Sequence, residues 1–113
     1  MIFGKNTVII KILIFFILIF EETEMISLKV TINNSVGLHA RPATFFVQKA
    51  NCYKSSIWVE KDDCRVNAKS LLGVLSLGIS KDTEITIIAD GADEGAAVEG
   101  LKTLVENELC DKG

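Results

Sequence analysis

The only histidine of the chain, His39, lies two residues before Arg41 and three before Pro42. Proline is favoured in the first turn of a helix, so this pattern predicts a helix that begins between His39 and Pro42. The free N–H groups at a helix start bind anions, and an arginine gives a bidentate contact to phosphate or carboxylate oxygens. The positive end of the helix dipole also disfavours imidazolium, which leaves neutral imidazole available as a nucleophile. These residues fit a histidine that accepts a phosphoryl group, and they fit a plain surface or capping histidine as well.

The length and composition limit the chain to one small globular domain. Its 113 residues suit a single domain, and 49% of them are hydrophobic. The formal net charge is −3, which argues against a nucleic acid as a direct partner because no large positive field is present. Cys52, Cys64 and Cys110 form no Cys-x-x-Cys pair, so neither a zinc site nor a disulfide framework is indicated, and a reducing cytoplasm fits best. We expect no metal and no cofactor.

The first 24 residues differ in composition from the rest of the chain. Val8–Phe20 is apolar except for Lys11, whereas the sequence after Met25 has the mixed composition of a folded domain. The apolar run is shorter than the roughly 20 residues of a membrane-spanning helix, and the following Glu21–Glu24 is not a small-residue cleavage site. Purine-rich codons for Glu21 and Glu22 would lie where a bacterial ribosome-binding site precedes a start codon. We therefore expect residues 1–24 to be an apolar extension outside the native protein, no membrane partner, and a folded domain over residues 25–113.

Hydrophobic periodicity predicts four strands and three helices. Apolar and polar residues alternate from Ile26 to Ile32, and strand-forming residues recur over 56–60, 64–67 and 84–89. Helical patterns start near His39, at Ser70–Gly78, and after Asp93, where apolar residues recur as far as Leu109. The order β-α-β-β-α-β-α favours an α+β domain, with helices on one face of a four-stranded, mostly antiparallel sheet. A solvated face is expected for the acidic residues of the last helix: Asp93, Glu94, Glu99, Glu106 and Glu108.

Two segments of the chain carry recognisable motifs: Gly37–Ala43 (GLHARPA) and Val66–Gly78 (VNAKSLLGVLSLG). The first resembles the active-site motif of the HPr family, the histidine-containing phosphocarriers of the bacterial sugar phosphotransferase system, and the second resembles the motif around that family's regulatory serine. The resemblance implies an HPr-like open-faced β-sandwich over the whole domain. It also implies a carrier rather than an enzyme. In such a carrier a ring nitrogen of His39 (Nδ1 in the family) takes a phosphoryl group from Enzyme I, Arg41 stabilises the phosphate, and sugar-specific IIA proteins receive it.

The same resemblance implies regulation at Ser70. This residue is similar to the family's regulatory serine and fits the N-cap of a short helix. The implied partners are an ATP-dependent HPr kinase/phosphorylase and a catabolite-control transcriptional regulator, which would link a cytoplasmic, monomeric carrier to carbon catabolite repression. An apolar patch beside His39 is a candidate docking surface, although its members also fit an ordinary core: Thr44, Phe45, Val47, Gln48, Leu71, Leu72 and Leu75.

Two other functions compete with the phosphocarrier. The first is a regulatory binding protein that is phosphorylated only on the serine. Family members of that type carry another residue at the position of His39, so the histidine favours transport. The second is a small catalytic domain with His39 as general base, but the motif offers no second titratable group to share acid and base chemistry.

Overall fold

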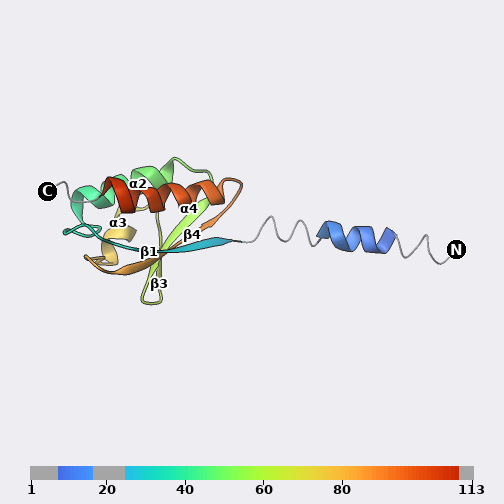
Figure 1. The fold of residues 1–113 in the computed structure, drawn as a ribbon, viewed down its shortest axis with the longest axis horizontal. Helices are drawn as coiled ribbons and strands as arrows, with labels where there is room; N and C mark the ends of the chain where they lie inside the picture. The colour runs from blue at the N-terminus through green and yellow to red at the C-terminus, as the bar shows by residue number, and fades with distance from the viewer. Residues whose placement is uncertain (1–7, 17–24, 110–113) are drawn as a thin grey trace.

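The computed structural model describes residues 8–16 and 25–109 (Figure 1). Residues 8–16 form a helix with exposed side chains, and the rest of the predicted extension lies outside the described residues. No helix in the described part is long and apolar enough to cross a membrane. The described domain contains, in chain order, β1 (Ile26–Thr31), α2 (Ala40–Asn51), β2 (Ser56–Lys61), β3 (Cys64–Asn67), α3 (Leu71–Ser76), β4 (Glu84–Asp90), α4 (Glu94–Thr103) and η1 (Leu104–Glu108).

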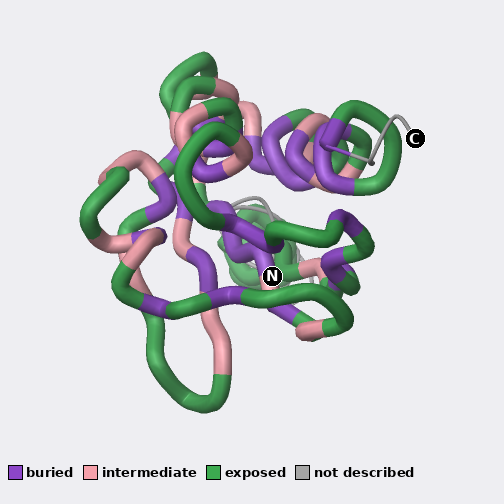
Figure 2. Tube along the Cα trace, turned by 90° about the vertical axis from the view of Figure 1, so that its left-hand side faces the viewer, coloured by how far each residue is buried: buried purple, intermediate pink, exposed green. Residues whose placement is uncertain are grey.

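The four strands form one sheet in the order β1-β4-β2-β3, and every neighbouring pair is antiparallel. The α+β prediction is therefore confirmed. Successive side chains of a strand point to opposite faces of the sheet, and this alternation places Val30, Ile57 and Ile87 in the core. Trp58, the residue after Ile57, points to the other face and is only partly buried. Helices α2 and α4 lie over one face of the sheet (Figure 1). Buried positions gather between these two layers, and the β2–β3 hairpin tip is exposed (Figure 2).

Helix α3 is short and is held by contacts at both ends. It packs against α2 and β3. Past its C-terminus, Gly78 adopts a positive φ of 58°, the left-handed conformation that commonly ends a helix. The Lys61 ammonium at the end of β2 donates to the carbonyl oxygens of Leu77 and Gly78, each at 3.2 Å. A lysine at this position satisfies the free carbonyl groups that follow the helix and complements its dipole.

The predicted last helix is present but is not regular throughout. Helix α4 ends at Thr103 and continues as a π-helical turn, in which the Leu109 N–H donates to the Leu104 carbonyl five residues earlier at 2.9 Å. This wider turn brings Leu104 and Leu109 onto one face, and both are buried. Sequence periodicity alone does not distinguish such a turn from an α-helix.

Two of the acidic residues predicted on a solvated face instead make structural contacts. The Asp93 carboxylate accepts hydrogen bonds from the Lys54 and Ser55 backbone N–H groups at 2.8 and 2.9 Å, and from the Ser55 hydroxyl. Glu94 is 9% exposed, and its carboxylate accepts from the Gly91 N–H at 3.3 Å. The prediction was wrong for both because the Asp93 carboxylate satisfies backbone donors of the loop before β2, and the Glu94 carboxylate satisfies the N–H of Gly91. Glu99, Glu106 and Glu108 are exposed, as predicted.

Candidate functional site

A tightly pinned loop leads from β1 to His39. The Gly37 N–H donates to the Asn34 carbonyl at 3.1 Å, and the Asn34 side-chain amide donates to the Gly37 carbonyl at 2.7 Å. The Leu38 N–H then donates to the Ile79 carbonyl at 3.0 Å, and the Leu38 side chain is fully buried. Gly37 has a φ of 61°, a conformation that glycine adopts at no steric cost. These contacts fix the backbone immediately before His39.

His39 is the N-cap of α2, so the predicted helix start is confirmed. Its backbone is extended, with φ −115° and ψ 155°, and its exposed side chain makes no capping hydrogen bond. The next residue, Ala40, has a φ of 48°, which is uncommon for a residue with a side chain and often marks a functional site. Within the described residues, neither the side chain of His39 nor that of the exposed Arg41 has a hydrogen-bond or ion-pair partner. Both side chains are therefore available to a ligand.

The predicted docking residues are divided between surface and core. Phe45, Leu71 and Leu72 are exposed by 46%, 40% and 81%. Gln48 is exposed and Thr44 intermediate, and the Thr44 hydroxyl donates to the Ala40 carbonyl at 3.1 Å. The last two members, Val47 and Leu75, are partly buried and pack against the hydrophobic core. Helices α2 and α3 contact one another, which brings the two halves of the set together.

Ser70 is the N-cap of α3, as the sequence predicted. Its hydroxyl oxygen accepts a hydrogen bond from the Gly73 N–H at 3.1 Å, and its carbonyl accepts from the Val74 N–H at 3.0 Å. The residue before it is tied to the last residue of α2, because the Asn51 side-chain amide donates to the Lys69 carbonyl at 3.3 Å. Helix α2 has 12 residues, which corresponds to a rise of about 18 Å from the His39 end to the Asn51 end. Ser70 and His39 therefore lie toward opposite ends of α2.

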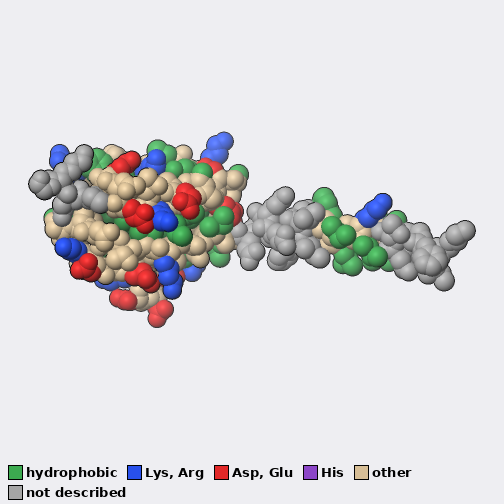
Figure 3. All heavy atoms as spheres, in the orientation of Figure 1, with side chains coloured by type: hydrophobic (Ala, Val, Ile, Leu, Met, Phe, Trp, Pro, Cys, Tyr) green, Lys and Arg blue, Asp and Glu red, His purple; other side chains and the backbone are tan. Residues whose placement is uncertain are grey.

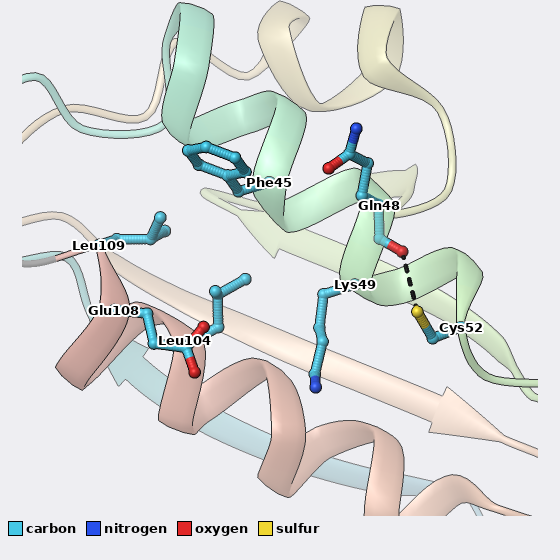
Figure 4. Close-up of a pocket in the computed structure, with 7 residues that line it drawn as sticks. All are labelled: Phe45, Gln48, Lys49, Cys52, Leu104, Glu108 and Leu109. Carbon is cyan, nitrogen blue, oxygen red and sulfur yellow. Dashed lines mark hydrogen bonds between the residues drawn. The ribbon is translucent and has the colours of Figure 1, made fainter.

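A groove between α2 and the end of the last helix was not predicted from the sequence. Figure 4 shows Phe45 and Lys49 on α2 extending toward the last helix, which contributes Leu104, Glu108 and Leu109, and Gln48 and Cys52 complete the lining. The groove has a volume of about 380 Å³. The inclusion of Phe45 in the predicted docking surface was a partial signal, but the opposite wall depends on how α2 and α4 pack.

The described residues contain no cluster of metal-ligating side chains. Cys52 and Cys64 are exposed free thiols, and Cys110 lies outside the described residues. On the face shown in Figure 3, acidic and basic side chains are interspersed over the domain. The His39 and Arg41 pair is thus the described arrangement best suited to bind an anion and react with it.

Comparison with known proteins identifies the family. The family profile described as the PTS HPr component phosphorylation site matches residues 26–107. The HPr-like protein Crh of Bacillus subtilis is 47% identical over 85 residues, which cover 75% of this chain and all of that protein.

Among solved structures, HPr-C-His from Thermoanaerobacter tengcongensis is 43% identical with a TM-score of 0.75, covering 78% of this chain and 99% of that one. HPr from Bacillus anthracis is also 43% identical, with a TM-score of 0.71, covering 73% and 98%. The chain therefore belongs to the HPr family of phosphocarrier proteins.

Proposed function

We propose that this chain carries a phosphoryl group on His39 between Enzyme I and sugar-specific IIA proteins of the phosphotransferase system. The observation that carries the proposal is the exposed, unpartnered imidazole of His39 at the start of α2, within the matched family motif. In the first step, a ring nitrogen lone pair forms a bond to phosphorus while the bond between phosphorus and its Enzyme I donor breaks. In the second step, the same phosphoryl group leaves His39 for a nucleophile on the IIA protein.

Arg41 and the start of α2 supply the electrostatic stabilisation in this mechanism. The Arg41 guanidinium is exposed and has no partner among the described side chains, so it can turn toward the phosphate oxygens. The first N–H groups of the helix add further donors. The pinned loop at Gly37 keeps the His39 backbone in place, which reduces the entropy lost when a partner protein docks. The site stabilises the carried group, and the partner proteins supply the catalysis.

We further propose that HPr kinase/phosphorylase phosphorylates Ser70 with ATP. The support is the family motif around Ser70 and its half-buried N-cap position beside the exposed Leu71 and Leu72. A phosphoserine carries nearly two negative charges, so it would weaken docking of Enzyme I on this apolar surface and favour a catabolite-control transcriptional regulator instead. A carrier with these partners works in the cytoplasm.

A purely regulatory role is the second candidate. The solved relatives include a protein described as the catabolite repression HPr of Bacillus subtilis, 46% identical to this chain. Its name supports a role in catabolite repression, whereas His39 supports transport. A general-base enzyme finds less support, because no titratable side chain in the described part forms a hydrogen bond or ion pair with the His39 side chain.

Incubation of the purified chain with Enzyme I and labelled phosphoenolpyruvate tests the carrier role. We expect one acid-labile, base-stable phosphoryl group per chain, and none in His39→Ala. Arg41→Ala should slow the transfer about tenfold or more while the fold is retained. Arg65→Ala, which removes the other arginine at a distant hairpin, is the matched control and should transfer at the normal rate. Label on the His39→Ala variant would assign the acceptor elsewhere.

A charge substitution tests the regulatory role. Ser70→Asp should slow phosphorylation of His39 by Enzyme I. The control is Ser27→Asp, which adds the same charge to an exposed residue of β1. If Ser70→Asp accepts the phosphoryl group as fast as the unmodified chain, the proposed electrostatic mechanism is wrong.

A further inference from the structure

The segment before Ser70 is attached to the end of α2 by two side chains from different parts of the chain. The Asn51 amide donates to the Val47 carbonyl within α2 at 2.9 Å and to the Lys69 carbonyl at 3.3 Å. In the opposite direction, the Lys69 ammonium donates to the Tyr53 carbonyl at 2.7 Å in a part-buried position. These two contacts join residues 16 and 18 positions apart in the sequence.

The Ala68 N–H donates to the Ile57 carbonyl at 2.9 Å and ties the segment to β2, so Asn51 and Lys69 are the contacts that fix its position toward α2, and the remaining hydrogen bonds are local. The Lys69 N–H donates to the Asn67 side-chain oxygen at 2.9 Å, and the Ser70 N–H donates to the Asn67 carbonyl at 3.1 Å. Both bonds lie within a single turn, so they fix its conformation. They leave the orientation of the turn relative to α2 to Asn51 and Lys69.

We propose that Asn51 and Lys69 are positioning residues for phosphorylation of Ser70. The inference rests on the proposed function of Ser70. Transfer of a phosphoryl group from ATP depends mainly on the position of the acceptor hydroxyl, and a displacement of about 1 Å can cost a factor of 10² in rate. Ser70 directly follows Lys69, so any movement of the Lys69 backbone moves the Ser70 hydroxyl.

The geometry distinguishes this role from a contribution to general stability. Asn51 is exposed and Lys69 is partly buried. Neither side chain belongs to the buried core between the sheet and the helices. Loss of either contact should therefore loosen the Ser70 segment while His39, at the other end of α2, keeps its environment.

The test measures two phosphorylation reactions on the same variants of the full chain. Ser70 is phosphorylated with HPr kinase/phosphorylase and Mg-ATP, and His39 with Enzyme I and phosphoenolpyruvate. For Asn51→Ala and Lys69→Met we expect kcat for Ser70 to fall about tenfold with little change in KM. The kcat for His39 should stay within about twofold of the unmodified chain, because weaker docking of Enzyme I on Leu71 and Leu72 would change KM instead. Lys69→Arg keeps a donor that reaches the Tyr53 carbonyl and should restore most of the activity.

Matched controls carry the same two substitutions, Asn to Ala and Lys to Met, at other positions of the chain. Asn107→Ala and Lys81→Met change exposed residues of η1 and of the loop before β4, and both reactions should be unaffected. Equal kcat for Ser70 in Asn51→Ala, Lys69→Met and the unmodified chain would overturn the positioning role while the modification itself stands. A parallel fall of kcat on Ser70 and His39 would also overturn it, because that result indicates a general loss of folding. An unmodified chain that takes no phosphate on Ser70 would instead reject the proposed modification, and the positioning role with it.

Discussion

Gly37 lies directly against the backbone of Ile79. A side-chain carbon on Gly37 would lie 2.2 Å from the Ile79 carbonyl oxygen, the same oxygen that accepts the hydrogen bond from Leu38. This distance is too short for any Cβ atom, and because the Ile79 oxygen is a backbone atom it cannot move aside as a flexible side chain could. The loop that carries His39 is thus closed onto the segment after α3 by a contact that requires glycine.

Gly37→Ala should lower the free energy of unfolding by about 2–4 kcal/mol, because a positive φ and a backbone clash act together. The displaced loop should also slow phosphorylation of His39 by Enzyme I. Gly78→Ala is the matched control, since Gly78 has a similar φ of 58° with no atom within 4 Å of the added carbon. It should cost only about 1 kcal/mol. Equal losses in the two variants, measured by urea unfolding, would show that the contact with Ile79 is unimportant.

Asp93 should make the stability depend on pH in the acid range. The hydrogen bond from the Ser55 hydroxyl, followed by that from the Lys54 N–H, lowers the pKa of Asp93 from 3.8 to about 2. A group with a lowered folded-state pKa stabilises the fold fully above its unfolded pKa and loses that effect as the pH falls through the folded pKa. Asp93→Asn should therefore be less stable than the unmodified chain at pH 7, and the difference should narrow as the pH falls from about 4 to 2.

Urea unfolding at a series of pH values measures this difference. Glu99→Gln is the control, because Glu99 is an exposed carboxylate on the same helix. Its stability should follow that of the unmodified chain at every pH. A gap between Asp93→Asn and the unmodified chain that stays constant down to pH 2 would contradict the assignment, since it would not depend on ionisation of Asp93.

Local sequence signals predicted the start of α2 and the N-cap of α3 correctly. Pro42 restricts the backbone at the first turn of α2, and the Ser70 hydroxyl accepts a hydrogen bond from the free N–H three residues later. Both signals therefore act within one helical turn. The motif containing His39 could be identified because its residues are contiguous in the sequence. Its exposure and its lack of a partner depend on the folded surroundings and had to be seen in the structure.

Contacts between distant segments were not predictable in this way. Asp93 accepts from residues 38 and 39 positions earlier, and no pattern near Asp93 indicates those partners. The groove beside Phe45 likewise depends on the packing of α2 against the last helix, which the π-helical turn at Leu104 alters. Periodicity shows which residues share a face, but it does not show which other element covers that face.

We propose that translation starts at Met25. The family profile begins at Ile26, and the purine-rich codons of Glu21 and Glu22 are separated from the Met25 codon by two codons, those of Thr23 and Glu24. Mass spectrometry of the protein from its own cells should find a first peptide that begins at Met25 or Ile26. A chain that retains Ile12–Phe20 and sediments with membranes would contradict the proposal and would indicate an anchoring role for that segment.

Leu72 and Val74 lie in the same short helix but should respond to truncation in opposite ways. Leu72 is 81% exposed and Val74 is fully buried. Leu72→Ala should change the free energy of unfolding by less than about 0.5 kcal/mol, because little apolar area is lost from the core and alanine suits a helix. It should weaken binding of Enzyme I about tenfold if Leu72 is a central docking residue. Val74→Ala should instead cost about 2 kcal/mol of stability through the cavity that it leaves.

Calorimetric titration with Enzyme I, combined with urea unfolding, separates the two effects. In Val74→Ala the remaining folded protein should bind with nearly normal affinity, because the exposed surface of α3 is unchanged. Normal affinity in Leu72→Ala would remove Leu72 from the docking surface. The exposure of Leu72 would then need another explanation, since an apolar side chain left this far in water gains nothing from the fold itself.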